Sequence, residues 1–109
     1  MVLSATHEPT RAEVDELPGP TVLEFGAPWC GHCQIVQPML ASALSAHHAV
    51  RHLKIEDGKG LPLGRSFGVK LWPTLVFLHD GQEVERLVRP TRATTINDAV
   101  MRLQIAATV

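Results

Sequence analysis

The fold is decided by the stretch TVLEFGAPWCGHC, residues 21–33 of a chain of 109 residues. Its first part, residues 21–25, is a β-favouring apolar run bounded by Pro and Gly on both sides, which is typical of a buried strand. From Cys33 onward apolar residues recur every three or four positions, which predicts a helix with one core face. The stretch therefore predicts a strand leading directly into a helix, with both cysteines of the chain, Cys30 and Cys33, at the junction.

Further elements are predicted on either side of this junction. They are a strand at Val2–Ala5, a short helix after Thr10 with a capping box to Glu13, a strand at Val50–Glu56, a weak helix at Leu63–Phe67, a strand at Thr74–Leu78, a hairpin turn at Asp80-Gly81, a strand at Glu83–Val88 and a last helix around Ile96–Leu103 capped by Thr94 or Thr95. Pro38 is expected to kink the long helix.

This order, βαβαβαββα, predicts an α/β fold with a mixed sheet of about five strands and helices on both faces. The length is that of one domain, residues 1–109. In such sheets ligands bind beyond the carboxyl ends of the strands, which directs attention to the end of the strand at residues 21–25.

Composition excludes several classes of function. Ten Lys and Arg against eleven Asp and Glu leave a net charge of -1, which disfavours nucleic acid and anionic membranes as partners. No apolar run approaches the ~18 residues of a membrane span, and the first residues lack the apolar core of a secretory signal. We therefore expect a cytoplasmic protein.

The two cysteines admit four interpretations. A structural disulfide would close a loop of four residues and stabilise the fold by roughly 2 kcal/mol, which is a weak staple. A zinc site needs four ligands, whereas only one cysteine pair is present. Two inert buried thiols are a third alternative. Redox exchange is favoured over these, because a helix N-terminus stabilises a thiolate at Cys30 and Cys33, three residues on, is placed to attack a mixed disulfide there.

The residues between the cysteines fit the same interpretation. Gly31 is expected to permit a tight turn, and His32, when protonated, to stabilise the Cys30 thiolate further. A stabilised thiolate makes the pair more oxidising.

The segment FGAPWCGHC, residues 25–33, resembles the active site of the thioredoxin superfamily, and its APWCGHC part resembles a catalytic domain of protein disulfide isomerase. Pro38, the segment Trp72-Pro73-Thr74 and residues 77–81 match further family motifs, so the resemblance spans nearly the whole chain. It implies a thioredoxin fold and a monomeric protein-disulfide oxidoreductase without a bound cofactor. Its redox-active disulfide would receive electrons from NADPH through a thioredoxin reductase.

The resemblance also implies roles for individual residues. Cys30 would be the attacking nucleophile, Cys33 the resolving thiol and Glu24 a buried acid that exchanges a proton with Cys33. A carboxylate inside the apolar run 21–25 is costly to bury unless it is paired; the alternative is that Glu24 faces solvent from an edge strand.

Three further residues are expected to contact substrate. Pro73 would be the family's cis-proline, whose loop pairs with an extended peptide as an added strand. Trp29 and Trp72 lie beside the matched loops and are expected to frame the site or face substrate, with core packing as the alternative.

The chain departs from the family pattern at three positions. His52 stands where the families keep a lysine beside the buried acid, with Lys54 as the alternative if the register shifts by two. Gly26 replaces an aromatic residue and is expected to open space near the site. Arg89 falls where thioredoxins carry a glycine that contacts substrates.

The resulting functional hypothesis is a reductase of protein disulfides that works through Cys30 and Cys33. An isomerase-like or oxidising poise is one alternative. A non-enzymatic binding module or chaperone is another.

Overall fold

The computed structural model describes residues 2–4, 8–58 and 61–108. In chain order the elements are β1 (Val2–Ser4), α1 (Arg11–Asp15), β2 (Pro20–Gly26), α2 (Gly31–Ser45), β3 (Arg51–Glu56), α3 (Pro62–Ser66), β4 (Thr74–His79), β5 (Gln82–Val88) and α4 (Ala93–Thr108). The predicted order βαβαβαββα is confirmed. Ala5, the last residue of the first predicted strand, lies outside the described residues.

The sheet is mixed, with the strand order β1-β3-β2-β4-β5. β2 runs parallel to β3 and antiparallel to β4, and the three-residue β1 extends the sheet beyond β3. Because β2 has a strand on each side and helices over both faces, its residues 21–25 are all buried, as the apolar run predicts. The carboxyl end of β2 therefore lies at the middle of one edge of the sheet.

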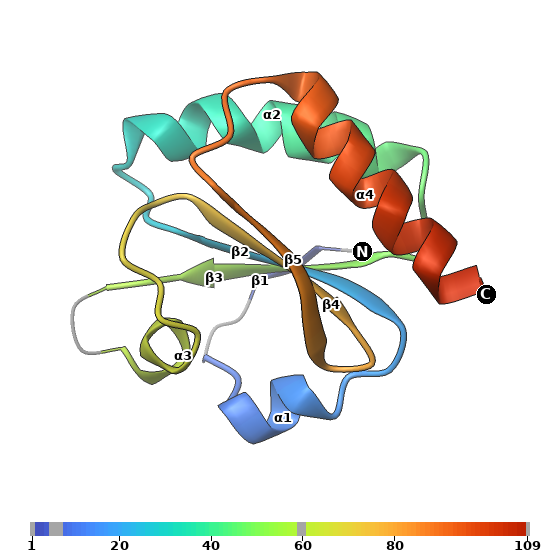
Figure 1. Cartoon of the computed structure of the whole chain (residues 1–109). Helices are drawn as coiled ribbons and strands as arrows, with labels where there is room; N and C mark the ends of the chain where they lie inside the picture. Colours follow the sequence, from blue (N-terminus) through green and yellow to red (C-terminus); the bar gives the residue numbers. More distant parts are fainter. Residues whose placement is uncertain (1, 5–7, 59–60, 109) are drawn as a thin grey trace.

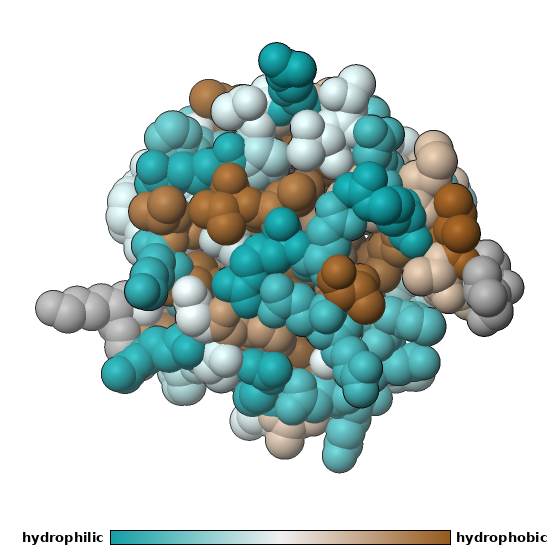
Figure 2. Space-filling model, viewed as in Figure 1, coloured by the Kyte–Doolittle hydropathy of each residue, from teal (hydrophilic) through white to brown (hydrophobic). Residues whose placement is uncertain are grey.

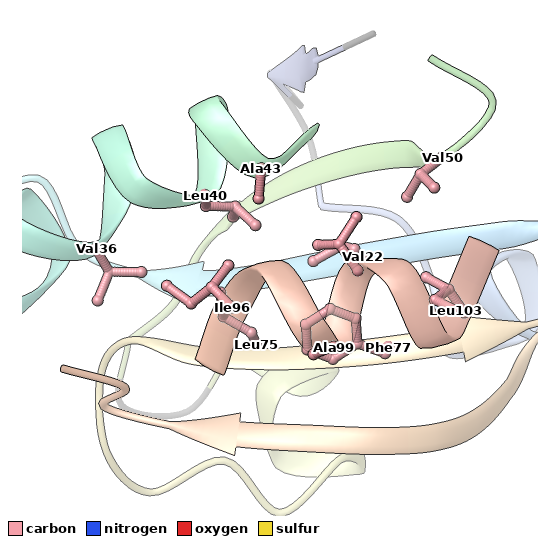
Figure 3. Close-up of a cluster of buried hydrophobic side chains, with 11 residues drawn as sticks. Val22, Val36, Leu40, Ala43, Val50, Leu75, Phe77, Ile96, Ala99 and Leu103 are labelled. Atoms are coloured by element: carbon pink, nitrogen blue, oxygen red, sulfur yellow. The ribbon is translucent and has the colours of Figure 1, made fainter. Parts of the chain in front are cut away.

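Helices cover both faces of the sheet, as the sequence predicts (Figure 1). α2 and α4 pack on one face, where their apolar stripes meet the sheet in a cluster that includes Leu40, Phe77 and Ile96 (Figure 3). α1 and α3 lie over the opposite face, around Val14, Leu63 and Phe25. Two separate cores thus hold β2 in place from both sides.

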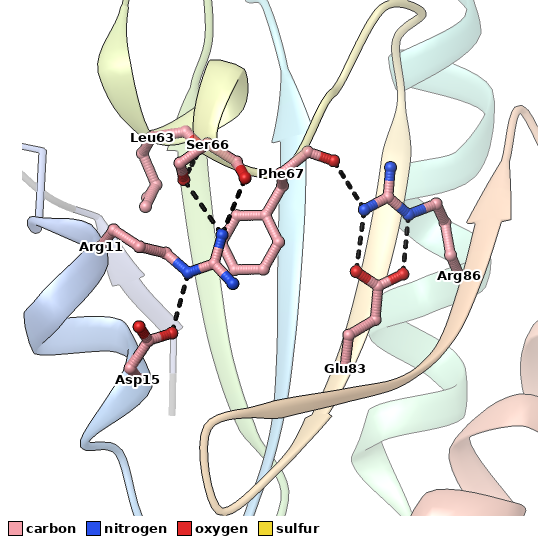
Figure 4. A network of polar contacts seen from close by, with 7 residues as sticks. All are labelled: Arg11, Asp15, Leu63, Ser66, Phe67, Glu83 and Arg86. Carbon is pink, nitrogen blue, oxygen red and sulfur yellow. Dashed lines mark hydrogen bonds and ion pairs between the residues drawn. The ribbon is translucent and has the colours of Figure 1, made fainter.

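A polar network fixes the smaller helices to the far strand (Figure 4). From α1, Arg11 donates to the Ser66 carbonyl at 2.8 Å, and its guanidinium stacks 3.8 Å from the centre of the Phe67 ring. From β5, Arg86 donates to the Phe67 carbonyl at 2.7 Å and pairs with Glu83. These contacts join α1, the end of α3 and β5 at one side of the molecule.

The turn between β4 and β5 has the predicted hairpin chemistry. Asp80 and Gly81 both have positive φ, +51° and +81°, which two-residue hairpin turns require. A Cβ on Gly81 would lie 1.9 Å from the Asp15 carbonyl oxygen, so α1 packs against the turn too closely for any larger residue. Glycine is therefore required here for both its backbone angle and its size.

The predicted cap of the last helix was wrong. α4 begins at Ala93, so Thr94 and Thr95 lie within its first turn and do not precede it. The Ile96 amide donates to the Arg92 carbonyl, which shows that the helical ladder already starts one residue before Ala93. Pro38 lies inside α2, which continues through it to Ser45.

The surface carries hydrophobic side chains scattered among hydrophilic ones on the face shown in Figure 2. Large exposed apolar residues on β5 and α4 include Val84, Val88, Met101 and Ile105. Dispersed surface apolar residues are normal in globular proteins. Among the described residues no helix has the length and apolar character needed to cross a membrane.

Candidate active site

The two cysteines meet at the start of α2. Cys30 is the N-cap residue, with extended backbone angles, and the Cys33 amide donates to Cys30 Sγ at 3.2 Å. Both are free thiols, and Cys30 is 6% exposed while Cys33 is 1% exposed. The Cys30 sulfur therefore takes the position in which a cap side chain accepts from the helix, where the helix dipole favours negative charge.

The two thiols differ in their acid–base properties. Burial raises the pKa of Cys33 to about 11, and the hydrogen bond and charge of Cys30 and the charge of Glu24 act in the same direction. A backbone hydrogen bond with Ala27 opposes them in part. Cys33 thus holds its proton at neutral pH and needs an acceptor for it before it can act as a nucleophile.

Glu24 on β2 and His52 on β3 form a buried pair. Glu24 is 2% exposed, and His52 Nε2 lies 2.8 Å from Glu24 Oε1. In the parallel ladder between β2 and β3 the residue opposite Glu24 is Lys54, yet Lys54 is exposed and the contact comes from His52, two residues earlier. The carboxylate is therefore both buried and paired, and the alternative of a solvent-facing Glu24 is excluded.

A pocket adjoins this pair on the surface between β2, β3 and α2. It measures about 180 Å³ and is lined by Glu24, Gly26, Ala27, Pro28, Gln37, Lys54, Ile55 and Glu56. Gly26 was expected to open space near the site, and it does line the pocket. Gly26 also lies close to a cysteine. A Cβ at this position would be 2.7 Å from Cys33 Sγ, which is too short for a normal contact. Gly26 thus makes room for the Cys33 thiol.

Trp29 and Trp72 meet in front of the cysteines. Their rings are 5.2 Å apart between centroids in an edge-to-face arrangement, and Trp29 is 74% exposed. Trp72 is half-buried and packs against the small cluster of Ala27, Cys30 and Cys33. Both tryptophans thus lie beside the cysteines, as expected. Core packing is excluded for Trp29.

The loop before β4 carries Pro73. The peptide bond between Trp72 and Pro73 is cis, and Pro73 is buried. The indole Nε1 of Trp72 donates to Asp57 Oδ2 at 2.9 Å, and the Asp57 amide donates to the Gly26 carbonyl at 2.8 Å. Asp57 thus connects the end of β2 to the Trp72 side chain, a role that no feature of the sequence signalled.

Arg89 reaches the same loop from the end of β5. It has φ of +48°, its amide donates to the Pro73 carbonyl at 2.9 Å, and its Nε donates to the Trp72 carbonyl at 2.9 Å. The departure from the family glycine marked this position in the sequence. The contact of its side chain with Trp72 was not foreseen.

The two residues between the cysteines are exposed on the first turn of α2. Gly31 was expected to permit a tight turn; it begins the helix without a positive φ, and a Cβ there would meet no atom within 4 Å, so neither backbone angle nor space requires glycine. Among the described residues His32 forms no hydrogen bond or ion pair with Cys30. Nor do those residues contain three His, Cys, Asp or Glu side chains grouped so that they could hold a metal ion.

The family model described as Thioredoxin matches residues 1–102 of the chain. The chain belongs to the thioredoxin family. Its structure is similar to that of reduced thioredoxin 2 from Pseudomonas aeruginosa, with a TM-score of 0.84, 54% identity and 94% of each chain covered. The family and these likenesses are those of a thiol–disulfide oxidoreductase.

Curated sequences show the same family. Thioredoxin 1 of Synechococcus elongatus is 30% identical over 87 residues, which cover 79% of this chain and 81% of that thioredoxin. Protein disulfide-isomerase A2 of Pongo abelii is 39% identical over 87 residues, which cover 74% of this chain but 17% of that protein. The chain thus spans most of a thioredoxin and under a fifth of the isomerase.

Proposed function

We propose that the chain reduces protein disulfides and that Cys30 and Cys33 are the exchanging pair. One observation carries the proposal, namely that two free thiols lie together at the start of α2 with the Cys33 amide donating to Cys30 Sγ. That geometry stabilises charge on one sulfur and brings the second within reach of it. It is the arrangement that thiol–disulfide exchange requires.

The reaction follows from the difference between the two thiols, of which Cys30 is stabilised as a thiolate and Cys33 is protonated. The Cys30 thiolate attacks one sulfur of a substrate disulfide, which forms a mixed disulfide and releases the other substrate sulfur as a thiolate. Cys33 then loses its proton and attacks Cys30 Sγ, which releases the second substrate thiol. The chain is left with a Cys30–Cys33 disulfide, and the substrate has gained two electrons and two protons.

Glu24 is the proposed acceptor of the Cys33 proton. Its charge already acts on the Cys33 thiol, and its burial keeps it from bulk water. His52 would position this carboxylate through the 2.8 Å contact and is the positioning residue of the pair. A carboxylate held in this way is a base that is fixed in place before the substrate arrives.

Substrate would dock on the exposed side of the cysteines. Trp29, Trp72 and Pro73 are the proposed substrate-binding residues, because aromatic side chains and a loop with an amide at Trp72 that is unpaired among the described residues suit an extended peptide. Gly31 and His32 would modulate the pair, with protonated His32 favouring the Cys30 thiolate.

The wider setting is also a proposal. Residues 1–109 would form a single thioredoxin-like domain that acts as a monomer in the cytoplasm. It would need no bound cofactor and would be reduced again by a thioredoxin reductase with electrons from NADPH. Membership of the thioredoxin family supports protein disulfides as the substrates.

Reduction of insulin, followed by turbidity in the presence of NADPH and a thioredoxin reductase, tests the proposal. We expect turnover by the wild-type chain and none by Cys30→Ser. Ser45→Ala, which changes an exposed hydroxyl at the far end of α2, is the matched control and should retain the wild-type rate. Undiminished turnover by Cys30→Ser would contradict the mechanism.

An isomerase-like or oxidising poise is the second candidate. The Gly31-His32 pair between the cysteines and the 39% identity to protein disulfide-isomerase A2 favour it. Equilibration of the Cys30–Cys33 pair with glutathione distinguishes the two, because a reductase holds its disulfide at a lower potential.

A non-enzymatic binding module is the third candidate, and the exposed Trp29–Trp72 pair favours it. In that case a partner would remain bound to a variant in which Ser replaces both cysteines. Trapping of mixed disulfides by Cys33→Ser would count against it.

A further inference from the structure

The backbone of Trp72 offers an incoming peptide a free amide and a carbonyl that already accepts one hydrogen bond. Its amide donates to no residue that the structure describes. Its carbonyl accepts from Arg89 Nε at 2.9 Å. A peptide that pairs with this loop as an added strand uses both an N–H and a C=O of the same residue. The Arg89 guanidinium therefore takes one of the two lone-pair directions of the carbonyl that a substrate N–H would use.

Arg89 is held in this position by its own backbone. Its φ of +48° is rare for any residue except glycine, asparagine and aspartate. The hydrogen bond from its amide to the Pro73 carbonyl fixes the chain end of β5 against the loop. The backbone of Arg89 thus places its exposed side chain within hydrogen-bond reach of the Trp72 carbonyl.

The guanidinium has no acidic partner in the described part of the chain. Of the six other arginines, which all lie within the described residues, three pair with a carboxylate, namely Arg11, Arg86 and Arg102. The acid in this loop cluster, Asp57, accepts from the Trp72 indole and not from Arg89. Arg89 therefore uses one of its five N–H donors to bond a neutral carbonyl. Its positive charge has no carboxylate partner among the described residues.

A carboxylate is a better acceptor for Arg89 than the Trp72 carbonyl. Two parallel, charge-assisted hydrogen bonds to a carboxylate are stronger than one bond to a neutral oxygen. A docking segment that presents Asp or Glu would draw the guanidinium away and so free the Trp72 carbonyl for its own backbone. A neutral segment would have to displace Arg89 without that gain.

We propose that Arg89 makes this site selective for disulfide segments that carry a carboxylate close to the reacting cysteine. The proposal rests on the proposed function and names the substrate class of the same site. In it, Arg89 exchanges the Trp72 carbonyl for the substrate carboxylate, and the chemistry at Cys30 is unaltered. Selection acts when the peptide docks and therefore appears in KM.

The test uses a series of short peptide disulfides. A single Glu is placed in turn at each of the three positions before and the three after the cysteine, and each peptide is compared with its Gln counterpart. For the wild-type chain we expect kcat/KM to favour Glu about three- to five-fold at one or more positions, the size of a partly exposed ion pair. The preference should decrease with rising salt.

Two variants distinguish the effect of the Arg89 guanidinium from that of the Arg89 backbone conformation. Arg89→Asn keeps a residue that tolerates positive φ and should lose the preference while reducing the Gln peptides faster than the wild type, because the Trp72 carbonyl is released. Arg89→Glu should reverse the preference, so that Lys peptides are favoured over Glu peptides. Arg92→Ala removes an exposed charge three residues away and should keep the wild-type preference.

The outcomes separate this inference from the proposed function. Equal kcat/KM for Glu and Gln at all six positions, or a Glu preference that persists in Arg89→Asn, would overturn the role of Arg89 alone. If no peptide is reduced, the proposed function fails, and NMR titration with peptides that carry Ser in place of Cys decides the inference separately. A lower Kd for Glu than for Gln would support it, and equal Kd values would overturn it.

Discussion

The site has a buried inner half and a more exposed outer half. The inner half consists of Cys33, Glu24 and His52, all buried and joined by a close contact between the carboxylate and the imidazole. The outer half consists of Trp29, Trp72 and Arg89, which are exposed to solvent to different degrees, and the Arg89 guanidinium bonds to a neutral carbonyl.

The difference reflects what burial costs. A carboxylate or thiol inside the protein must be paired or must change its ionisation, so the inner half has few acceptable arrangements. An exposed indole or guanidinium is satisfied by water and is free to take many partners. We therefore expect inner substitutions to change stability and proton transfer, and outer substitutions to change the choice of substrate.

Replacing His52 should give the largest loss of stability. His52→Ala leaves the Glu24 carboxylate buried without its partner, which costs about 3 kcal/mol in the free energy of unfolding. Urea denaturation of the reduced protein at pH 7 measures this.

Lys54→Ala, on the same strand but exposed, is the control and should change stability by less than about 0.5 kcal/mol. Adding Glu24→Leu to His52→Ala should restore much of the loss, because both polar partners are then gone. A loss in His52→Ala no larger than in Lys54→Ala would show that the pair is not a structural unit.

Gly26→Ala should be the next largest effect. The new Cβ would lie 2.7 Å from Cys33 Sγ, and relieving that overlap costs about 2 kcal/mol. Gly31→Ala places the same methyl group in open space and should leave stability nearly unchanged. Urea denaturation compares the two, and the cost at Gly26 should shrink when Cys33→Ala is added. If Gly26→Ala lowered the free energy of unfolding equally in the wild type and in Cys33→Ala, the new methyl group would not be in contact with Cys33.

The raised pKa of Cys33 makes the stability of the reduced protein depend on alkaline pH. Burial raises this pKa from the ordinary 9.0 to about 11, so between these values the unfolded chain releases a proton that the folded chain retains. The folded state therefore loses stability as pH rises through this window, by up to about 3 kcal/mol, and is unaffected below it. Denaturation of the wild type and of Cys33→Ala from pH 8 to 11 measures how the free energy of unfolding changes with pH. The fall expected for the wild type should be absent from the variant.

Trp29→Ala should have the smallest effect on stability. Its side chain is 74% exposed, so the loss should stay within about 1 kcal/mol and come mainly from the edge-to-face contact with Trp72. Its effect should appear in KM for a protein disulfide. A loss as large as that of His52→Ala would show that Trp29 supports the fold as the inner half does.

The sequence predicted the fold well because its signals are local. The apolar run of β2, the helical spacing of α2 and the Asp80-Gly81 turn each act within a few residues. The start of α4 was missed because Thr94 and Thr95 have the chemistry of a cap, whereas the ladder that begins at Arg92 decides the boundary.

The site residues were predictable only where they belong to a recognisable sequence motif. Cys30, Cys33 and Pro73 follow from the match to a known segment. The choice between His52 and Lys54 depends on side-chain direction across two parallel strands, which alternation alone leaves open. The contacts of Asp57 and Arg89 with Trp72 join residues 15 and 17 positions apart, and no local pattern encodes them.

Trapping of the mixed disulfide tests most directly the claim that Cys30 attacks and Cys33 resolves. Cys33→Ser and Cys30→Ser are each incubated with a peptide disulfide, and the adduct is located by mass spectrometry. We predict a stable adduct at Cys30 in Cys33→Ser and almost none at Cys33 in Cys30→Ser, because the Cys33 thiol is buried and protonated. Equal adducts in the two variants, or an adduct at Cys33 alone, would contradict the account.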